Sequence, residues 1–246
     1  MIDKALFVGN TGAKDTMHKL QLITNNLSNL NTPGFREDLE SKKTFQASEN
    51  GIQTRAYPQT DKSYSNFDHG PMLTTGRDLD VAIEGKGFFS VISKTGEEGY
   101  TRAGDFHIED GLLKTTAGQV VKGTSGVVSI PGDAERMSIG DDGTVAIKIK
   151  GQPQTVTINR LKLTNPDISQ LQKGPDGLFY TLDGSPVLQS DKIKLVRGTL
   201  EGSNVNPVET LTDLIELSRE FEMNTNLMKI LQDNATQANG VLELPR

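Results

Sequence analysis

The sequence has no cysteine and no tryptophan, and aromatic residues make up only 5% of its 246 positions. Without cysteine, the chain can form neither disulfides nor thiolate metal sites. No apolar run approaches the roughly 18 residues that a membrane-spanning helix needs, so we expect no direct insertion into a membrane. Residues 1–17 carry four charged side chains and no apolar core, so we also expect no cleaved secretory signal.

Positive charge is also scarce. The chain has 26 basic and 32 acidic residues, a net charge of −6. The imbalance is concentrated in residues 201–246, which hold eight acidic and three basic side chains. The sequence offers no basic patch that could bind a phosphate backbone, so we expect no nucleic-acid partner.

The sequence contains no motif that indicates catalysis, a cofactor or a metal. His18, His69 and His107 are far apart and belong to no H-E-x-x-H pattern. The acidic runs Asp78-Leu79-Asp80 and Asp141-Asp142-Gly143 do not continue as EF-hand loops, and turn formation explains them. Two strand carboxylates could still meet as a glycosidase pair, although the scarcity of aromatic residues argues against a sugar cleft. We predict no enzyme activity, no cofactor and no metal site.

A long heptad repeat between residues 211 and 242 organises the chain. Apolar or small residues recur there at alternating steps of three and four, which is typical of a coiled coil. One column is mostly apolar and the other mostly polar: the first is Leu214, Phe221, Met228, Ala235 and Leu242, and the second is Leu211, Ser218, Thr225, Gln232 and Asn239. A half-polar seam weakens pairing but can fix register and partner. Such a helix needs a second helix against it.

The N-terminal segment, residues 2–31, is predicted to be that second helix. Its most apolar part is Leu20, Ile23, Leu27 and Leu30, which stand at alternating steps of three and four. The helix should end at Asn31-Thr32-Pro33-Gly34, because proline cannot continue a helix and glycine permits a left-handed turn. The C-terminal helix should begin with Asn206 as N-cap and Pro207 at the first helical position.

The middle of the chain changes pattern twice. Residues 35–68 show no helical or strand period and are predicted to be an extended connector, at most closed into a loose hairpin. From residue 70 to 200, short β runs alternate with turns, several of them Asp-Gly, which is a strong hairpin signal. The predicted strands are Asp80–Ile83, Phe88–Ile92, Tyr100–Phe106, Leu112–Thr115, Val120–Lys122, Val127–Ile130, Met137–Ile139, Val145–Ile149, Thr155–Leu163, Leu178–Thr181 and Ile193–Val196.

These patterns together predict an α+β fold. Long N- and C-terminal helices (1–34 and 202–246) would pair as a coiled-coil-like hairpin and form a discontinuous assembly domain. The connector (35–68) would lead to one all-β domain (69–201). Each helix has one narrow apolar column and no broad face that could cover the β domain. Ordering costs about 1–2 kcal/mol per residue for the backbone alone. We therefore expect the helix pair to pack against other subunits.

Four asparagines, Asn25, Asn26, Asn29 and Asn31, cluster near the end of the first helix. One interpretation is a polar helix end, where asparagine is favoured. The other is a polar face that hydrogen-bonds to neighbouring subunits. Composition alone slightly favours the first interpretation.

Three motifs resemble signatures of the bacterial flagellar rod and hook proteins. They are Ile23–Phe35, Gly76–Phe89 with Tyr100–Phe106, and Gly202–Glu209 with Arg219–Glu222, in that family's order over the whole chain. Leu30 departs from the family pattern, in which valine or alanine is common there. Gly198–Val205 and Arg219–Met223 are similar to the proximal-rod branch of the family.

The resemblance implies a structural protein of the flagellar basal body whose terminal helices pack around a central channel, with the β domain outside. Its partners would be copies of itself and other rod and hook proteins. It would be exported through the flagellar type III apparatus without a cleaved signal, into the rod in the periplasmic space, and its helices would order on assembly. The resemblance also favours subunit contacts for the asparagine cluster. The joints would be Thr32-Pro33-Gly34, Gly202-Ser203 and Asn206-Pro207.

Two alternatives stay open at this point. The first is a distal-rod or hook subunit of the same family. The second is a secreted β-rich ligand-binding module or enzyme with helical oligomerisation ends.

Overall fold

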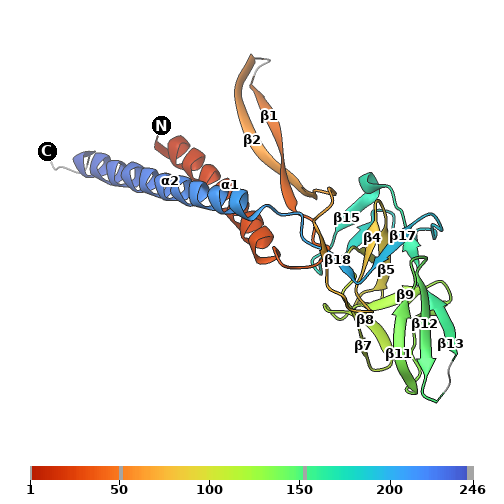
Figure 1. Ribbon diagram of the computed structural model, residues 1–246. Helices are drawn as coiled ribbons and strands as arrows, with labels where there is room; N and C mark the ends of the chain where they lie inside the picture. Colours follow the sequence, from red (N-terminus) through yellow and green to blue (C-terminus); the bar gives the residue numbers. More distant parts are fainter. Residues whose placement is uncertain (1, 50–51, 152–153, 243–246) are drawn as a thin grey trace. The chain divides into compact units, whose positions relative to one another are not determined.

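The computed structural model describes residues 2–49, 52–151 and 154–242, with side chains described in 9–40, 64–151, 154–234 and 236–237. Two helices and several β sheets make the fold α+β, as predicted (Figure 1). The chain divides into two compact units. The helical unit comprises Met1–Ser28, Asp38–Tyr64 and Val205–Arg246, and the β unit comprises Asn29–Glu37 and Ser65–Asn204.

The two helices are α1 (Ile2–Ser28) and α2 (Pro207–Leu242). α2 begins as the sequence predicts: the Oδ1 atom of Asn206 accepts a hydrogen bond from the Val208 N–H at 3.1 Å. Pro207 takes the first helical position, where no N–H is needed. α1 ends three residues earlier than expected, because the chain turns between Asn29 and Thr32 (N to O, 3.2 Å) ahead of Pro33.

Most of the predicted connector is regular structure. Strands β1 (Asp38–Glu49) and β2 (Ile52–Ser65) form a two-stranded sheet, and it belongs to the helical unit. The hairpin that the sequence left open as part of an extended connector is thus present, and it is longer and more regular than expected. A two-stranded sheet builds little core, so it does not require the alternation of apolar and polar residues by which strands are recognised in sequences.

The β unit is built from short strands. Its largest sheet has nine, ordered β15-β16-β6-β5-β9-β8-β7, with β10 paired to β9 and β14 to β5. The others are a three-stranded sheet, β11-β12-β13, and the pairs β17-β4 and β18-β3. The bounds are β3 (Met72–Thr74), β4 (Val81–Glu84), β5 (Phe88–Ile92), β6 (Glu98–Thr101), β7 (Phe106–Glu109), β8 (Leu112–Thr115), β9 (Val120–Gly123), β10 (Gly126–Val127), β11 (Ala134–Ile139), β12 (Thr144–Ile149), β13 (Thr155–Arg160), β14 (Leu163–Thr164), β15 (Leu171–Lys173), β16 (Phe179–Thr181), β17 (Lys194–Arg197) and β18 (Thr199–Glu201), with a 3-10 turn at Ile168–Gln170.

The predicted strand Tyr100–Phe106 is two strands, β6 and β7. The chain leaves the ladder after Thr101 because Gly104 lies against the backbone of Val81, whose N–H donates to the Gly104 carbonyl at 3.1 Å. A Cβ on Gly104 would lie 1.7 Å from the Val81 carbonyl oxygen, so only glycine fits there. The sequence prediction also missed β3, β15 and β18, which are too short to show a period.

The Asp-Gly signals predicted most of their turns correctly. Asp110 (φ 53°) and Gly111 (φ 72°) form the two-residue hairpin loop between β7 and β8, as type I′ geometry requires. The pairs at 142–143 and 176–177 lie between β11 and β12 and between β15 and β16. Asp183-Gly184 is different, because it forms a turn after β16 that joins no paired strands.

The β unit encloses its own core. Its main cluster includes Phe89, Phe106, Leu113 and Ile147, each at most 1% exposed, and the rings of Phe89 and Phe106 meet edge to face at 5.2 Å. A second cluster packs Phe88, Tyr100 and Phe179 beneath Phe67. Because this core closes without help from α1 or α2, the β unit can be stable whatever the helices contact.

A half-buried carboxylate links strands of the large sheet. Glu98 on β6 accepts hydrogen bonds from Lys122 and Lys162 (both 2.6 Å) and from Ser90. Burial alone would raise the pKa of Glu98. The hydrogen bonds from the two lysines and the serine lower it by more, so the pKa of Glu98 lies below the usual value of 4.5. A carboxyl whose pKa is lowered by folding stabilises the fold above its unfolded pKa and loses that contribution as the pH falls through the folded value.

Glu98→Gln should therefore lower the free energy of unfolding at pH 7, and the deficit should shrink as the pH falls below about 4.5, where the unfolded carboxyl protonates. Urea denaturation of both proteins at pH 7 and pH 4 measures this. Glu135→Gln, at an exposed acid 3.9 Å from Lys148, is the matched control and should show little deficit at either pH. A Glu98→Gln deficit that is equal at both pH values would contradict the argument.

Candidate assembly surface

α2 carries a single row of half-buried side chains. The row is Leu214, Leu217, Phe221, Asn224, Met228 and Leu231, at alternating steps of three and four. The predicted apolar column contributes Leu214, Phe221 and Met228. The second predicted column, represented by Leu211, Ser218, Thr225 and Gln232, is exposed instead. Leu217, Asn224 and Leu231, each one position before a member of that column, are half-buried in its place. The two leucines make this row more apolar than the predicted column. The side chains of Ala235, Asn239 and Leu242 lie outside the described part of the chain.

α1 meets this row through small residues. The Asn224 amide lies 3.4 Å from the hydroxyl of Thr16, which is fully buried. A Cβ on Gly9 would lie 3.1 Å from the Met228 side chain, and Ala13 between them is 8% exposed. The α1 residues next to this row are therefore small.

The predicted residues near the end of α1 have different surroundings. Leu20, Ile23 and Leu27 are half-buried, as is Leu30 beyond the helix end. Asn26 is 4% exposed, and its amide donates to the Asp38 carbonyl and accepts from the Asp38 N–H, both at 2.9 Å. Its bonds therefore join α1 to β1 within the chain.

The other asparagines of the cluster are more accessible. Asn25 and Asn31 are exposed, while Asn29 is half-buried and accepts a bond from the Thr32 hydroxyl at 3.0 Å. Asn25 and Asn31 are thus the members of the cluster best placed to meet a neighbouring subunit.

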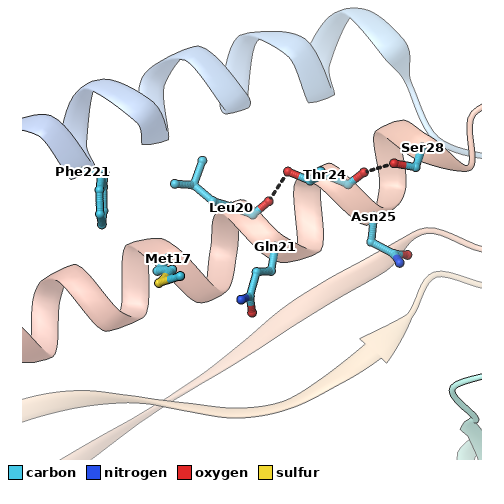
Figure 2. Close-up of a pocket in the computed structure, with 7 residues that line it drawn as sticks. All are labelled: Met17, Leu20, Gln21, Thr24, Asn25, Ser28 and Phe221. Atoms are coloured by element: carbon cyan, nitrogen blue, oxygen red, sulfur yellow. Dashed lines mark hydrogen bonds between the residues drawn. The ribbon is translucent and has the colours of Figure 1, made fainter.

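A groove of about 550 Å³ runs along the exposed side of α1 (Figure 2). Its lining is Met17, Leu20, Gln21, Thr24, Asn25, Ser28 and, from α2, Phe221. Leu20 points toward α2, whereas Gln21 and Asn25 point away from it (Figure 2). Most of the lining is exposed, and it mixes apolar side chains with amides and hydroxyls.

The first predicted joint, Thr32-Pro33-Gly34, is held firmly in the β unit. Gly34 has a φ of 67°, and its N–H donates to the Glu201 carbonyl at 2.7 Å. A Cβ on Gly34 would lie 2.3 Å from the carbonyl carbon of Arg102, so no other residue fits there.

The second predicted joint, Gly202-Ser203, is also buried and bonded. The Gly202 N–H donates to the Pro71 carbonyl at 2.8 Å. Asn204, which follows, bonds two other segments: its Oδ1 accepts from the Glu37 N–H at 2.7 Å, and its amide donates to the Asn66 carbonyl at 2.9 Å. The chain segments that lead to and from the helical unit are therefore clasped together.

A buried ion cluster lies at the centre of this clasp. Glu201 is fully buried and accepts a hydrogen bond from Arg36 at 2.8 Å and one from the Gly70 N–H at 3.2 Å. Arg102, also buried, lies 3.4 Å from the second carboxylate oxygen, and His69 lies 3.4 Å from the first. We call Arg36, Arg102 and Glu201 the ion clamp.

The ion clamp holds two guanidinium groups against one carboxylate. Burial lowers the pKa of Arg102 to about 10; Arg36 adds to the lowering and Glu201 opposes it. Arg102 therefore stays cationic at neutral pH. Backbone carbonyls offset the excess charge: Arg36 donates to Asp68, and Arg102 donates to Gly85.

Sequence reasoning assigned no role to these residues. Arg102, Glu201 and Asn204 stand inside the motifs that carried the resemblance, but Arg36 and Glu201 are 165 residues apart in the sequence. The available signal was a glutamate in a short segment bounded by glycines, Gly198-Thr199-Leu200-Glu201-Gly202. That signal is weak, because glutamate is almost never fully buried unless it is paired.

Glu201→Ala should lower the free energy of unfolding by about 3–5 kcal/mol, because it leaves two buried guanidinium groups without their carboxylate. Urea denaturation of the full chain, followed by the β-sheet signal in circular dichroism, measures this. The matched control is Glu135→Ala, which removes an exposed acid and should cost less than about 1 kcal/mol. Equal losses in the two variants would show that the clamp contributes no more than a surface ion pair.

Two further features bear on the possible class of site. Among the described helices, neither is long and apolar enough to cross a membrane. Within the described part of the chain, no three His, Asp or Glu side chains are grouped so that they could hold a metal ion.

Three family models match the chain. They are the flagella basal body rod protein over residues 6–36, the flagellar hook protein FlgE/F/G D1 domain over 82–147, and the flagellar basal body rod FlgEFG protein C-terminal over 196–241. Each overlaps one of the three motifs found in the sequence. The first match contains most of α1, and the third contains most of α2.

Curated relatives extend the match to the whole chain. The flagellar basal-body rod protein FlgF of Escherichia coli (strain K12) is 33% identical over 99% of this chain and 100% of its own length. FlgF of Salmonella typhimurium (strain LT2) is 31% identical over the same shares. FlgG of Buchnera aphidicola subsp. Schizaphis graminum is 32% identical over 90% of this chain and 93% of its own length. The resemblance is thus confirmed: the chain belongs to the flagellar basal-body rod protein family as a FlgF-like member, and it is a structural subunit of the rod.

Proposed function

We propose that this chain is a proximal-rod subunit without enzyme activity, which assembles through its terminal helices and transmits torque along the rod. The observation that carries the proposal is the division of the chain. Helices from opposite ends of the sequence share one compact unit, while the β unit closes its own core. Such a division leaves the helices available for contacts between subunits without cost to the β core.

The helices would pair as a coiled-coil-like hairpin. The half-buried row on α2 supports this, because steps of three and four place its side chains on one narrow strip. The small residues of α1 between Gly9 and Thr16 support it as well. The exposed column of Leu211, Ser218, Thr225 and Gln232, extended by Asn239, would then contact copies of the chain and other rod and hook proteins.

The ion clamp would serve the transmission of force. The joints Gly34 and Gly202 are fixed in the β unit, and Asn204 ties three segments at the same place. A load on α1 or α2 would therefore reach the β unit through residues that are already immobilised. The freedom expected of the joints would be confined to the ends of the helices, next to Ser28 and Asn206.

The route and place of assembly follow from the same proposal. The chain would pass unfolded through the flagellar type III export apparatus without a cleaved signal and join the rod in the periplasmic space. Its helices would order there, because the narrow row on α2 buries too little apolar surface to offset the ordering cost in a free monomer. The helical assembly domain would comprise 1–34 and 202–246.

A distal-rod role is the nearest alternative, supported by the FlgG relative at 32% identity. The segments Gly198–Val205 and Arg219–Met223, which resemble the proximal-rod branch, favour the proximal rod. Cross-linking of the assembled subunit to its neighbours would separate the two roles. A ligand and glycan screen on the protein would test the binding-module alternative, and we expect no ligand.

Phe221→Pro should abolish swimming, because a proline inside α2 removes a backbone hydrogen bond and costs about 3 kcal/mol or more. Swimming in soft agar, in a strain whose only copy of this protein is the variant, measures the effect. Phe221→Leu keeps an apolar side chain in the half-buried row and should swim nearly normally. Normal swimming of Phe221→Pro would contradict a role for α2 in assembly.

Limited proteolysis of the dilute monomer should remove both helices and leave the β unit, residues 29–37 and 65–204, resistant. Intact-mass measurement of the surviving fragment checks this. The same treatment of assembled rods should leave the helices intact, since their cleavage sites would then be covered. Full protection of α1 and α2 in the dilute monomer would overturn ordering on assembly.

A further inference from the structure

α2 has a second apolar face that the heptad columns did not reveal. Leu211, Ile215, Met223 and Leu227 are 46%, 54%, 64% and 49% exposed. With Arg219 they form a continuous row at steps of four, which we call the outer ridge. At about 100° per residue, the outer ridge lies on the opposite side of α2 from the half-buried row.

The groove on α1 has the same periodicity. Apart from Phe221 of α2, its lining consists of two rows of α1 at steps of four: Met17, Gln21 and Asn25 form one, and Leu20, Thr24 and Ser28 form the other (Figure 2). A groove between two such rows accepts a ridge whose residues also stand four apart. This is the commonest way in which helices pack in globular proteins, with axes crossing at about −50°.

The outer ridge cannot fill the groove of its own chain. The opposite side of α2 carries Asn224, which lies against Thr16 of α1, so the outer ridge points away from α1 of the same subunit. The groove is likewise open, because Met17, Gln21 and Thr24 are exposed. The two complementary surfaces therefore stay unmatched within one chain.

The chemistry of the two surfaces also agrees. Arg219 interrupts the apolar side chains of the outer ridge at its centre. The groove offers amide and hydroxyl oxygens from Gln21, Thr24 and Ser28, which can accept the guanidinium N–H groups. Acidic side chains such as Glu216 and Glu220 flank the outer ridge. Among the described side chains of α1, Asp15 and Lys19 pair with each other, and the remaining charged residues include Lys14 but no acid. The charges beside the two surfaces are therefore opposite in sign.

We infer that the outer ridge of one copy of this chain docks into the α1 groove of a second copy. This inference rests on the proposed function. It specifies that the outer ridge of α2 and the α1 groove of a second copy form one of the contacts between subunits. The contact is heterologous, because each copy offers a ridge on one side and a groove on the other. Such contacts add subunits head to tail. The rest of the polar column of α2, beyond the Leu211 that it shares with the outer ridge, stays available for other neighbours.

The absence of native cysteine allows a direct test in assembled rods. One tagged copy of the chain carries Gln21→Cys, a second copy carries Met223→Cys, and both are expressed together in a strain without the native protein. A short bis-maleimide is added to the isolated basal bodies. We expect a cross-linked dimer of twice the 26.7 kDa chain mass when both copies are present, and none when either is expressed alone.

Two controls make the result specific. Lys229→Cys replaces Met223→Cys in a parallel strain; it is exposed on the same helix but belongs neither to the outer ridge nor to the polar column, so it should give no dimer with Gln21→Cys. Met17→Cys with Leu227→Cys is a second pair along the ridge and groove, and it should also give the dimer. This pair keeps the test valid if one cysteine disturbs assembly.

The outcomes separate the inference from the proposed function. If the variants are absent from the rods of swimming cells, the rod-assembly proposal fails. If the variants are in the rod but neither pair gives the dimer, the docking inference is overturned. Cross-links from Met223→Cys to a different rod protein in place of the dimer, or a dimer from Lys229→Cys with Gln21→Cys when neither ridge pair gives one, would overturn it equally. A dimer in a strain with a single variant would show a two-fold contact and contradict the head-to-tail geometry.

Discussion

The rest of the molecule depends on one buried carboxylate. Glu201 is the last residue of the short strand β18, and through it Arg36 and Arg102 are held at the point where the chain leaves the β unit. Burying three charged groups costs several kcal/mol per ion, which the attraction repays only when the geometry is satisfied. Here Arg36 and Arg102 also donate to backbone carbonyls. The cluster therefore fixes the position of the crossing segments more than it adds stability.

That constraint explains why the glycines of the motifs stand where they do. Gly34 must come within reach of Arg102, and Gly70 must pass the carbonyl of Gly202, where a Cβ would lie 2.1 Å away. Both positions bring a second backbone against the segment that carries Glu201. Gly34, which the sequence predicts to be a joint, is thus a close-packing position.

The sequence predicted the parts of the structure that local patterns determine. The α+β class, the start of α2 at Pro207, and the hairpin at Asp110-Gly111 follow from capping and turn chemistry within a few residues. The ion clamp was not predicted because it joins residues far apart in the sequence, and the β1–β2 hairpin could only be left open because its strands show no period. On α2, the heptad pattern could not decide between Ser218 and its neighbour Leu217, because both fit a heptad column.

The two faces of α2 differ in period, and that difference separates their partners. The half-buried row repeats every seven residues, in one step of three and one of four. This is the spacing of left-handed helix pairs, whose axes cross at about +20°. The outer ridge advances by four at each step, so it drifts around the helix in the opposite sense. One partner helix cannot follow both rows, because the crossing angles differ. The spacing of α2 therefore fits the proposal that it has one partner helix within the subunit and another in a neighbouring subunit.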